Sequence, residues 1–103
     1  MAKGYWVGHV DVTDPEGYKS YVATNAEAFR KYGAKFLVRG GSFEAVAGKS
    51  RSRNVVLEFK DYATALACYR SPEYAKAMAH RDKSSVADII VIEGYDGPQP
   101  TDC

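Results

Sequence analysis

The chain has 103 residues, of which 46% are hydrophobic and 26% charged, and its formal net charge is +1. This length suits a single domain, and the composition is typical of a soluble globular protein. Nucleic-acid-binding domains concentrate positive charge on one surface, so the near-neutral charge argues against that class. The sequence has no apolar run of transmembrane length, no signal-peptide pattern, and two cysteines without a metal-ligand or disulfide spacing. We therefore expect a cytoplasmic protein with no membrane or nucleic-acid partner and no cofactor.

The first third of the chain predicts a strand followed by a helix. Apolar side chains alternate with mixed ones over residues 5–12, as in a strand with one packed face. Asp14 and Pro15 then mark a helix start, with Asp14 as the cap. From Tyr18 onward, aromatic and aliphatic residues recur at helical spacing, and Gly33 predicts the end of the helix.

The region after Gly33 predicts a second strand over residues 35–39, followed by the glycine pair 40–41. The pair is compatible with a tight hairpin turn or with a bulge that bends one long strand. We favour the bulge, with strand resuming over residues 42–47, because residues 48–53 already supply a turn. This turn also contains a basic cluster without interleaved aromatics, interpreted as solvated loop: Lys49, Arg51 and Arg53.

The second half repeats the pattern of a strand that leads into a helix. Residues 53–59 predict a strand, and Asp61 predicts the cap of the next helix. Pro72 interrupts that helix, so we expect a new helix to begin there with Ser71 as its cap and to run to about Lys83.

A last strand is predicted over residues 86–93, where the apolar run 89–92 is typical of burial on both faces. Residues 96–103 show no periodic pattern and are expected to form a loosely ordered tail after one domain at residues 1–95. The order strand, helix, strand, strand, helix, strand predicts an α+β, ferredoxin-like antiparallel sheet with two helices on one face. Apolar groups on the other face would be exposed to water in a monomer, so we expect a homodimer.

Five blocks carry a family resemblance: VDVTDPEGYKSYV (10–22), YGAKFLVRGG (32–41), RNVVLEF (53–59), YRSPEYAKAMAHR (69–81) and VIEGY (91–95). In these blocks the chain resembles the bacterial domain-of-unknown-function family 1330, DUF1330, over residues 5–95. The resemblance implies a dimeric α+β barrel in which two ferredoxin-like sheets close on each other, with a pocket between sheet and helices in each subunit. Related barrels include cofactor-free monooxygenases, isomerases and dehydratases, so an enzymatic role rests on analogy of fold.

His9 is the candidate catalytic base. It lies on the first strand beside apolar neighbours, and a buried histidine can accept a proton near neutral pH. More often such a histidine is part of the hydrogen-bonded structure. Asp11, two residues on, either orients His9 or marks the solvated end of the strand.

The candidate ligand-binding residues gather around the helix break and the end of the second strand. The guanidinium of Arg39 can bind a carboxylate or enolate, although an ion pair with Glu44 or Glu58 is an equal alternative. The helix start at Ser71 offers free amides to an anion, although capping alone also explains it. The full set is Tyr18, Arg39, Tyr69, Ser71, Tyr74 and Arg81.

Two functional hypotheses follow. In the first, a homodimer binds a small carboxylate-bearing or aromatic metabolite between sheet and helices, with cofactor-independent proton transfer or oxygenation as the possible chemistry. In the second, the protein is a non-catalytic binding or interaction module whose tyrosines and arginines form the dimer contact.

Overall fold

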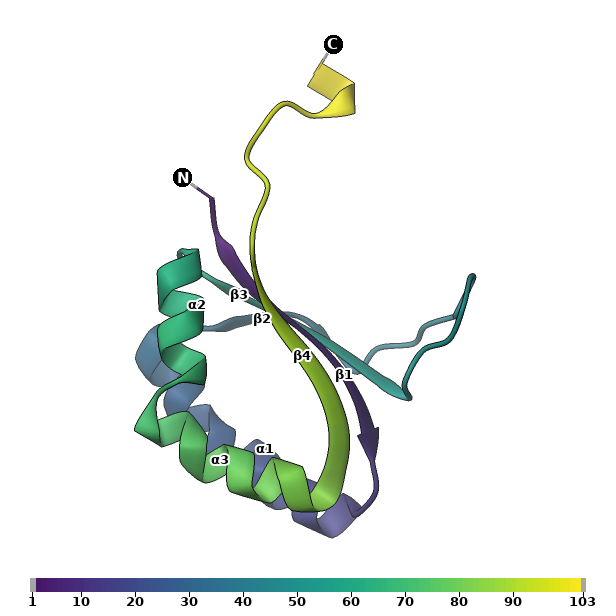
Figure 1. Ribbon diagram of the computed structural model, residues 1–103, viewed down its shortest axis with the longest axis vertical. Helices are drawn as coiled ribbons and strands as arrows, with labels where there is room; N and C mark the ends of the chain where they lie inside the picture. The colour runs from purple at the N-terminus through teal and green to yellow at the C-terminus, as the bar shows by residue number, and fades with distance from the viewer. Residues whose placement is uncertain (1, 103) are drawn as a thin grey trace.

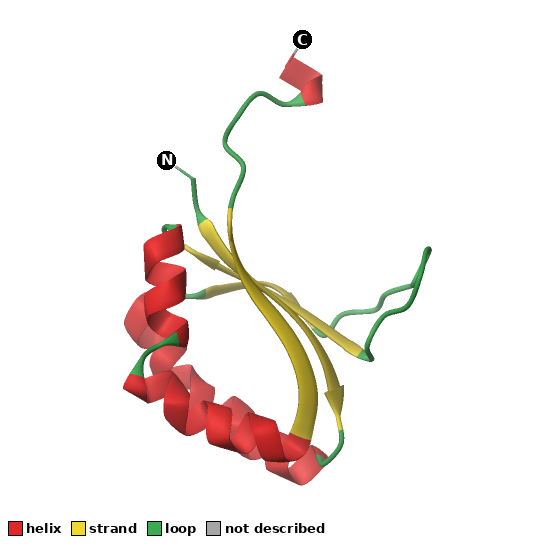
Figure 2. Cartoon of the chain, viewed as in Figure 1, coloured by secondary structure: helices red, strands yellow, loops and turns green. Residues whose placement is uncertain are grey.

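The computed structural model describes residues 2–102 and has the α+β architecture predicted from the sequence (Figure 1). Met1 and Cys103, the last residue of the predicted tail, lie outside the described residues. The elements in chain order are β1 (Gly4–Val12), α1 (Pro15–Tyr32), β2 (Lys35–Arg39), β3 (Arg53–Phe59), α2 (Tyr62–Tyr69), α3 (Pro72–Ser84), β4 (Ser85–Glu93) and the short 3-10 turn η1 (Pro100–Asp102). Within the described chain the strands form one four-stranded antiparallel sheet in the order β2-β3-β1-β4. Helices α1, α2 and α3 cover one face of this sheet, which is the expected ferredoxin-like arrangement (Figure 2).

The core lies between the helices and the inner face of the sheet, and Trp6 of β1 is at its centre. Trp6 pairs with Leu57 on β3 and is 2% exposed. Its indole contacts four aromatic rings at centroid distances of 4.9–5.4 Å: Phe29, Phe59, Tyr69 and Tyr74. Its Nε1 donates to the backbone oxygen of Ala65 at 2.8 Å, so the buried indole is satisfied.

The predicted side-chain caps of α2 and α3 form, whereas the predicted side-chain cap of α1 does not. The side chain of Asp61 accepts from the backbone nitrogen of Thr64 at 2.8 Å, and Ser71 Oγ accepts from the backbone nitrogen of Tyr74 at 3.1 Å. Asp14 occupies the N-cap position of α1, but its side chain makes no capping hydrogen bond. Gly33 ends α1 with a φ of 69°, as expected for a C-terminal glycine.

The strand predicted over residues 42–47 is absent, and the bulge interpretation is wrong. After Arg39, the backbone turns out of the sheet at Gly40, where φ is 66°, and residues 40–52 form an exposed loop that projects from the domain (Figure 1). The register irregularity lies instead inside β2, between Phe36 and Val38. β2 pairs with β3 alone, and β3 begins at Arg53, opposite the end of β2, so the residues beyond Gly41 have no strand residue opposite them inside the subunit.

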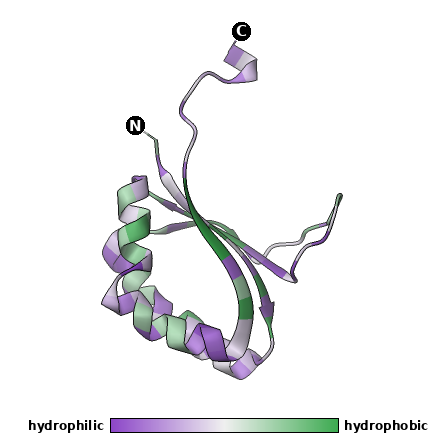
Figure 3. Ribbon diagram, in the orientation of Figure 1, coloured by the Kyte–Doolittle hydropathy of each residue, from purple (hydrophilic) through white to green (hydrophobic). Residues whose placement is uncertain are grey.

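The outer face of the sheet, opposite the helices, carries exposed aliphatic side chains. Along β4 the burial alternates, so the apolar run is covered by the subunit on its inner side only. Ile90 and Ile92 remain 55% and 47% exposed, and Figure 3 shows the hydrophobic stretch along β4. The expectation that this face is covered by a second copy stays a prediction.

The segment after β4 leads away from the domain (Figure 1). The backbone nitrogen of Gly94 donates to Lys3 O at 2.7 Å, which extends the contact between the first and last strands by one residue. The domain boundary at residue 95 stays a prediction. None of the helices described in residues 2–102 is both long and apolar enough to cross a membrane.

Candidate functional site

A crevice lies between the inner face of the sheet and helix α1. The empty space between its side chains is about 530 Å3 when the open mouth is included. The centre of a water molecule fits in only about 40 Å3 of this space. The crevice is therefore narrow. Its apolar walls come from all four strands and α1: Trp6, Gly8, Val10, Val22, Phe29, Phe36, Val55, Leu57 and Ile89.

The polar groups of the crevice are cationic or neutral. Three guanidinium groups, two phenols and one amide line it: Arg39, Arg53, Arg81, Tyr18, Tyr21 and Asn25. No carboxylate or imidazole belongs to this lining in the described chain. The crevice thus has hydrogen-bond donors and positive charge on an aromatic and aliphatic background.

Arg39 and Arg53 lie against aromatic rings and have no carboxylate partner within ion-pair distance among residues 2–102. The Arg39 Cζ is 4.1 Å from the centroid of the Phe36 ring, and the Arg53 Cζ is 5.7 Å from that of Tyr18. The Nε of Arg53 is buried and has no hydrogen-bond partner in the described structure. Two positive charges therefore face the crevice without a compensating negative group.

Of the two carboxylates that could form an ion pair with Arg39, Glu58 already has other partners. Glu58 lies on the outer face, where its carboxylate accepts from Lys3 Nζ at 3.2 Å and from the Tyr5 hydroxyl at 3.3 Å. An ion pair between Arg39 and Glu58 therefore does not form. Nor does the described structure pair Arg39 with Glu44, which leaves the guanidinium available to a ligand.

Arg81 is held by a cluster of phenols behind the crevice wall. Its Nη1 donates to the hydroxyls of Tyr69 and Tyr74 at 3.1 and 3.2 Å. Its Nε and Nη2 donate to Asp82 Oδ1 at 3.3 and 3.2 Å. The hydroxyls of Tyr21 and Tyr74 are 2.7 Å apart. Burial raises the pKa of Tyr21 and of Tyr74, so both phenols stay protonated at neutral pH.

Tyr74, a member of this cluster, and the nearby Ser71 are buried structural residues that do not line the crevice. Ser71 Oγ donates to the backbone oxygen of Cys68 at 2.7 Å while it caps α3, so its hydrogen-bonding capacity serves the helix break. Tyr74 is 0% exposed. Of the residues expected to bind ligand, Tyr18, Arg39 and Arg81 meet in the crevice, and Tyr69 and Tyr74 contact Arg81 from behind.

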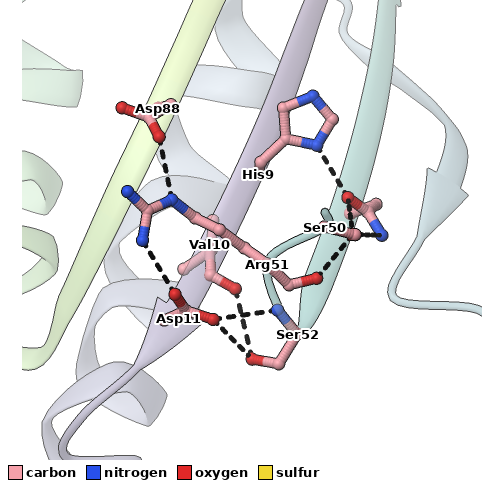
Figure 4. A network of polar contacts seen from close by, with 8 residues as sticks. His9, Val10, Asp11, Ser50, Arg51, Ser52 and Asp88 are labelled. Carbon is pink, nitrogen blue, oxygen red and sulfur yellow. Dashed lines mark hydrogen bonds and ion pairs between the residues drawn. The ribbon is translucent and has the colours of Figure 1, made fainter. Parts of the chain in front are cut away.

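His9 lies on the other side of the sheet. Alternation along β1 directs Trp6 and Val10 inward and His9 outward, where its Nδ1 is 2.7 Å from Asn54 Oδ1 (Figure 4). The crevice and His9 are thus separated by the backbone of the sheet.

Asp11 also lies on the outer face and contacts the end of the loop rather than His9 (Figure 4). Its carboxylate accepts from Arg51 Nη1 at 2.7 Å and from the Ser52 backbone nitrogen at 2.9 Å. These hydrogen bonds, from Ser52 first and then Arg51, lower the pKa of Asp11. Arg51 Nε also donates to Asp88 at 2.8 Å, so this network joins the loop to β1 and β4.

The interpretation of the basic cluster as solvated loop is wrong for Arg51 and Arg53. Arg51 is bound to two carboxylates, and Arg53 enters the crevice. The strand pattern contained the signal for Arg53, since period-two alternation places it on the same face as Val55 and Leu57. Tyr21 belongs to the helical series of aromatic and aliphatic residues that begins at Tyr18, a pattern that predicts packing. Asn25, one turn later, is 5% exposed and has no signal in the sequence that marks it as a site residue.

Residues 2–102 contain no group of three or more histidine, cysteine, aspartate or glutamate side chains that could hold a metal ion. The crevice itself offers guanidinium, phenol and amide groups, which suit an oxygen-bearing organic anion better than a cation.

Comparison with solved structures supports the fold assignment. The RPA0582 protein of unknown function from Rhodopseudomonas palustris superimposes with a TM-score of 0.75 at 16% identity, covering 93% of this chain and 85% of that chain. SnoaB, a cofactor-independent oxygenase from Streptomyces nogalater, gives a TM-score of 0.62 at 14% identity, covering 97% and 99%. A conserved protein of unknown function from Bacteroides thetaiotaomicron, described as a possible oxidoreductase, gives a TM-score of 0.57 at 10% identity. The match covers 89% of this chain and 97% of that chain.

At these identities the likeness extends to the fold alone. No curated protein gives a significant match to the sequence. The model of one family, however, matches residues 3–95, nearly the whole chain. The protein therefore belongs to the DUF1330 family, a domain of unknown function.

Proposed function

We propose that the protein is a cytoplasmic homodimer that binds a small carboxylate-bearing or aromatic molecule in the crevice of each subunit. The observation that carries this proposal is the pair of guanidinium groups, Arg39 and Arg53, which face an aromatic crevice without a carboxylate partner in the described chain. A guanidinium binds a carboxylate through two parallel hydrogen bonds, and its planar shape fits beside an aromatic ring.

The energetics also favour an anionic ligand. A buried donor without an acceptor costs about 1–3 kcal/mol, and the Nε of Arg53 is such a donor. A carboxylate bound beside Arg53 removes this cost and supplies the missing negative charge. Because the crevice is narrow, we expect entry of a ring to displace the side chains of Arg53 and Tyr18 at its edge.

Cofactor-independent proton transfer or oxygenation of the bound molecule is a second candidate function. Guanidinium and phenol donors in an apolar site stabilise an oxyanion, which is the species that such reactions pass through. The described lining has no carboxylate or imidazole to accept a proton, so we expect the molecule to enter as the oxyanion, with its proton already lost to solvent. The cofactor-independent oxygenase SnoaB shares the fold at 14% identity, which makes this chemistry compatible with the architecture. His9 faces away from the crevice, so we expect His9→Ala to leave ligand binding there unchanged.

The alternative of an interaction module built on the tyrosines and arginines is less consistent with their positions. Tyr18, Arg39 and Arg81 line the crevice on the helix-covered face, away from the exposed outer face. Exposed aliphatic side chains are available for a dimer contact on β2 and on the outer side of β4, next to the polar outer-face residues described above: Leu37, Val38, Val86, Ile90 and Ile92.

Homodimer formation through the outer face is tested with Ile90→Asp. A charge at this exposed aliphatic position opposes burial of the face, so the variant should shift from dimer to monomer in light scattering at micromolar concentration. Val46→Asp is the matched control, because Val46 is 88% exposed on the projecting loop and lies off the sheet. A monomeric wild type, or a dimeric Ile90→Asp variant, would overturn the pairing.

Ligand binding is tested with benzoate, a small aromatic carboxylate, by titration calorimetry. Arg53→Gln and Arg39→Gln should each weaken binding by roughly 10- to 100-fold, since a hydrogen bond to a charged group contributes about 1.5–3 kcal/mol. Arg70→Gln is the control, because Arg70 is exposed at the end of α2 and does not line the crevice. Absence of benzoate binding, or an equal loss in the Arg70 variant, would refute the proposal.

A further inference from the structure

We infer that the crevice selects ligands that carry an enolate, phenolate or carbonyl oxygen, because the hydroxyl of Tyr21 is held there as a hydrogen-bond donor. This inference rests on the proposed binding function and narrows the class of ligand. It follows from the direction of a hydrogen-bond chain that begins at Arg81, passes through Tyr74 and ends at Tyr21.

The first step is fixed by the chemistry of arginine. A guanidinium has only donors, so the oxygens of Tyr69 and Tyr74 must accept the two hydrogens of Arg81 Nη1. The other contacts of the guanidinium, from Nε and Nη2 to Asp82, hold its plane in position.

The second step is fixed by the burial of Tyr74. Its side chain is 0% exposed, so its own hydroxyl hydrogen requires an acceptor inside the protein. Within residues 2–102 the acceptor in reach is the hydroxyl oxygen of Tyr21, at 2.7 Å. If Tyr21 donated instead, the hydrogen of Tyr74 would be buried without a partner, at a cost comparable to a lost hydrogen bond. Tyr74 is therefore the donor.

The third step follows at Tyr21. Its oxygen accepts from Tyr74, and the side-chain amide of Asn25 acts in the same sense, since its hydrogen bond lowers the pKa of Tyr21 against the larger rise caused by burial. Both neighbours therefore donate to the phenol oxygen, which directs the phenol hydrogen to the crevice that Tyr21 lines. Burial raises the pKa of Tyr21, which keeps the proton on the phenol at neutral pH. Each donor in such a chain strengthens the next, so the cationic Arg81 makes Tyr21 a stronger donor than an isolated phenol. The preferred partner of this donor is an oxygen with negative charge.

The experiment compares 4-nitrophenolate with nitrobenzene, which share the ring and nitro group and differ in the oxygen. The wild type should bind 4-nitrophenolate at least ~10-fold more tightly, as expected for one charge-assisted hydrogen bond. Tyr21→Phe should remove most of this preference and leave nitrobenzene binding unchanged. The absorption band of bound 4-nitrophenolate should also shift relative to free 4-nitrophenolate in the wild type and lose that shift in the variant.

Two further variants distinguish the effect of the hydrogen-bond chain from Arg81 to Tyr21 from the general effect of removing a phenol. Tyr62→Phe removes a phenol that is exposed at the start of α2 and does not line the crevice, so this control should keep the preference. Tyr74→Phe should reduce the preference by a smaller factor than Tyr21→Phe, because it removes the polarising neighbour and keeps the donor.

The outcomes distinguish this inference from the proposed function. If benzoate binds but the wild type holds 4-nitrophenolate and nitrobenzene equally, the inference is overturned and the proposed function stands. An effect of Tyr62→Phe equal to that of Tyr21→Phe would overturn the inference as well. If none of the three probes binds, both fall. Equal affinity of the wild type for the two probes overturns the inference without any variant. Because Arg39 and Arg53 also favour the anionic probe, a preference in the wild type supports the inference only when Tyr21→Phe reduces it. If Tyr21→Phe misfolds, an unchanged preference in Tyr74→Phe overturns the inference.

Discussion

The substitution Gly40→Ala separates the geometry of the crevice from the stability of the fold. Gly40 has a φ of 66°, and a β-carbon added there would clash with Nη1 of Arg53 and lie 3.0 Å from its Cζ. The atoms in the way belong to the end of a flexible side chain, so the guanidinium moves and the backbone stays. The variant thus displaces one of the two unpaired guanidinium groups of the crevice without changing its chemical identity.

Gly48→Ala is a closely matched control. Gly48 lies in the same loop with a φ of 71°, and nothing lies within 4 Å of an added β-carbon. A left-handed backbone costs a residue other than glycine roughly 1–2 kcal/mol, so both variants should lose about this much free energy of unfolding. For a domain of this size, each kcal/mol lowers the melting temperature by roughly 4–8 °C.

Only Gly40→Ala should also weaken the binding of benzoate. Loss of a hydrogen bond from a charged donor costs about 1.5–3 kcal/mol, which predicts an affinity lower by roughly 10- to 100-fold. Scanning calorimetry measures the shared loss of stability, and titration calorimetry measures the difference in affinity. Equal benzoate affinities in the two variants would refute the argument that the position of Arg53 governs the site.

Three other predictions concern stability and reactivity. Ser71→Ala should lower the free energy of unfolding in urea by about 1–2 kcal/mol, because the backbone nitrogen of Tyr74 loses its cap, while Ser42→Ala in the exposed loop should have no effect. Cys68 should resist iodoacetamide in the folded protein and react after unfolding, as peptide mass spectrometry can show, because burial raises the pKa of its thiol to about 12. The lowered pKa of Asp11 contributes stability that is present above its unfolded value of 3.8 and is lost as the pH falls through the native value. Asp11→Asn should therefore flatten the acid side of the curve of melting temperature against pH, and parallel curves for variant and wild type would contradict this.

Local patterns were sufficient to predict most of the fold. Period-two alternation identified the inner face of β1 and β3, and the caps at Asp61 and Ser71 located the starts of α2 and α3. These signals are local because each depends on neighbours within a few residues. The same alternation also places His9 on the face opposite Trp6, which argues against His9 as a base for a ligand in the crevice.

Features that depend on distant contacts were not predictable in this way. Strand character over residues 42–47 required a paired neighbour, and β3, the partner of β2, begins only at Arg53 and leaves those residues without one. The pairing of Tyr21 with Tyr74 joins positions 53 residues apart and depends on how α1 packs on α3. Arg53 had the correct face in the strand pattern, but its position beside Tyr18 follows from packing between elements.

The interruption between α2 and α3 sets the angle between two side chains as well as ending a helix. In one continuous helix, Tyr69 and Tyr74 would point about 140° apart around the axis, because successive residues advance by about 100°. The change of direction at Ser71 and Pro72 cancels this divergence, so both hydroxyls reach the same nitrogen of Arg81. The short backbone segment at the junction therefore determines how the cation is oriented, and a straightened junction would leave it with a single phenol.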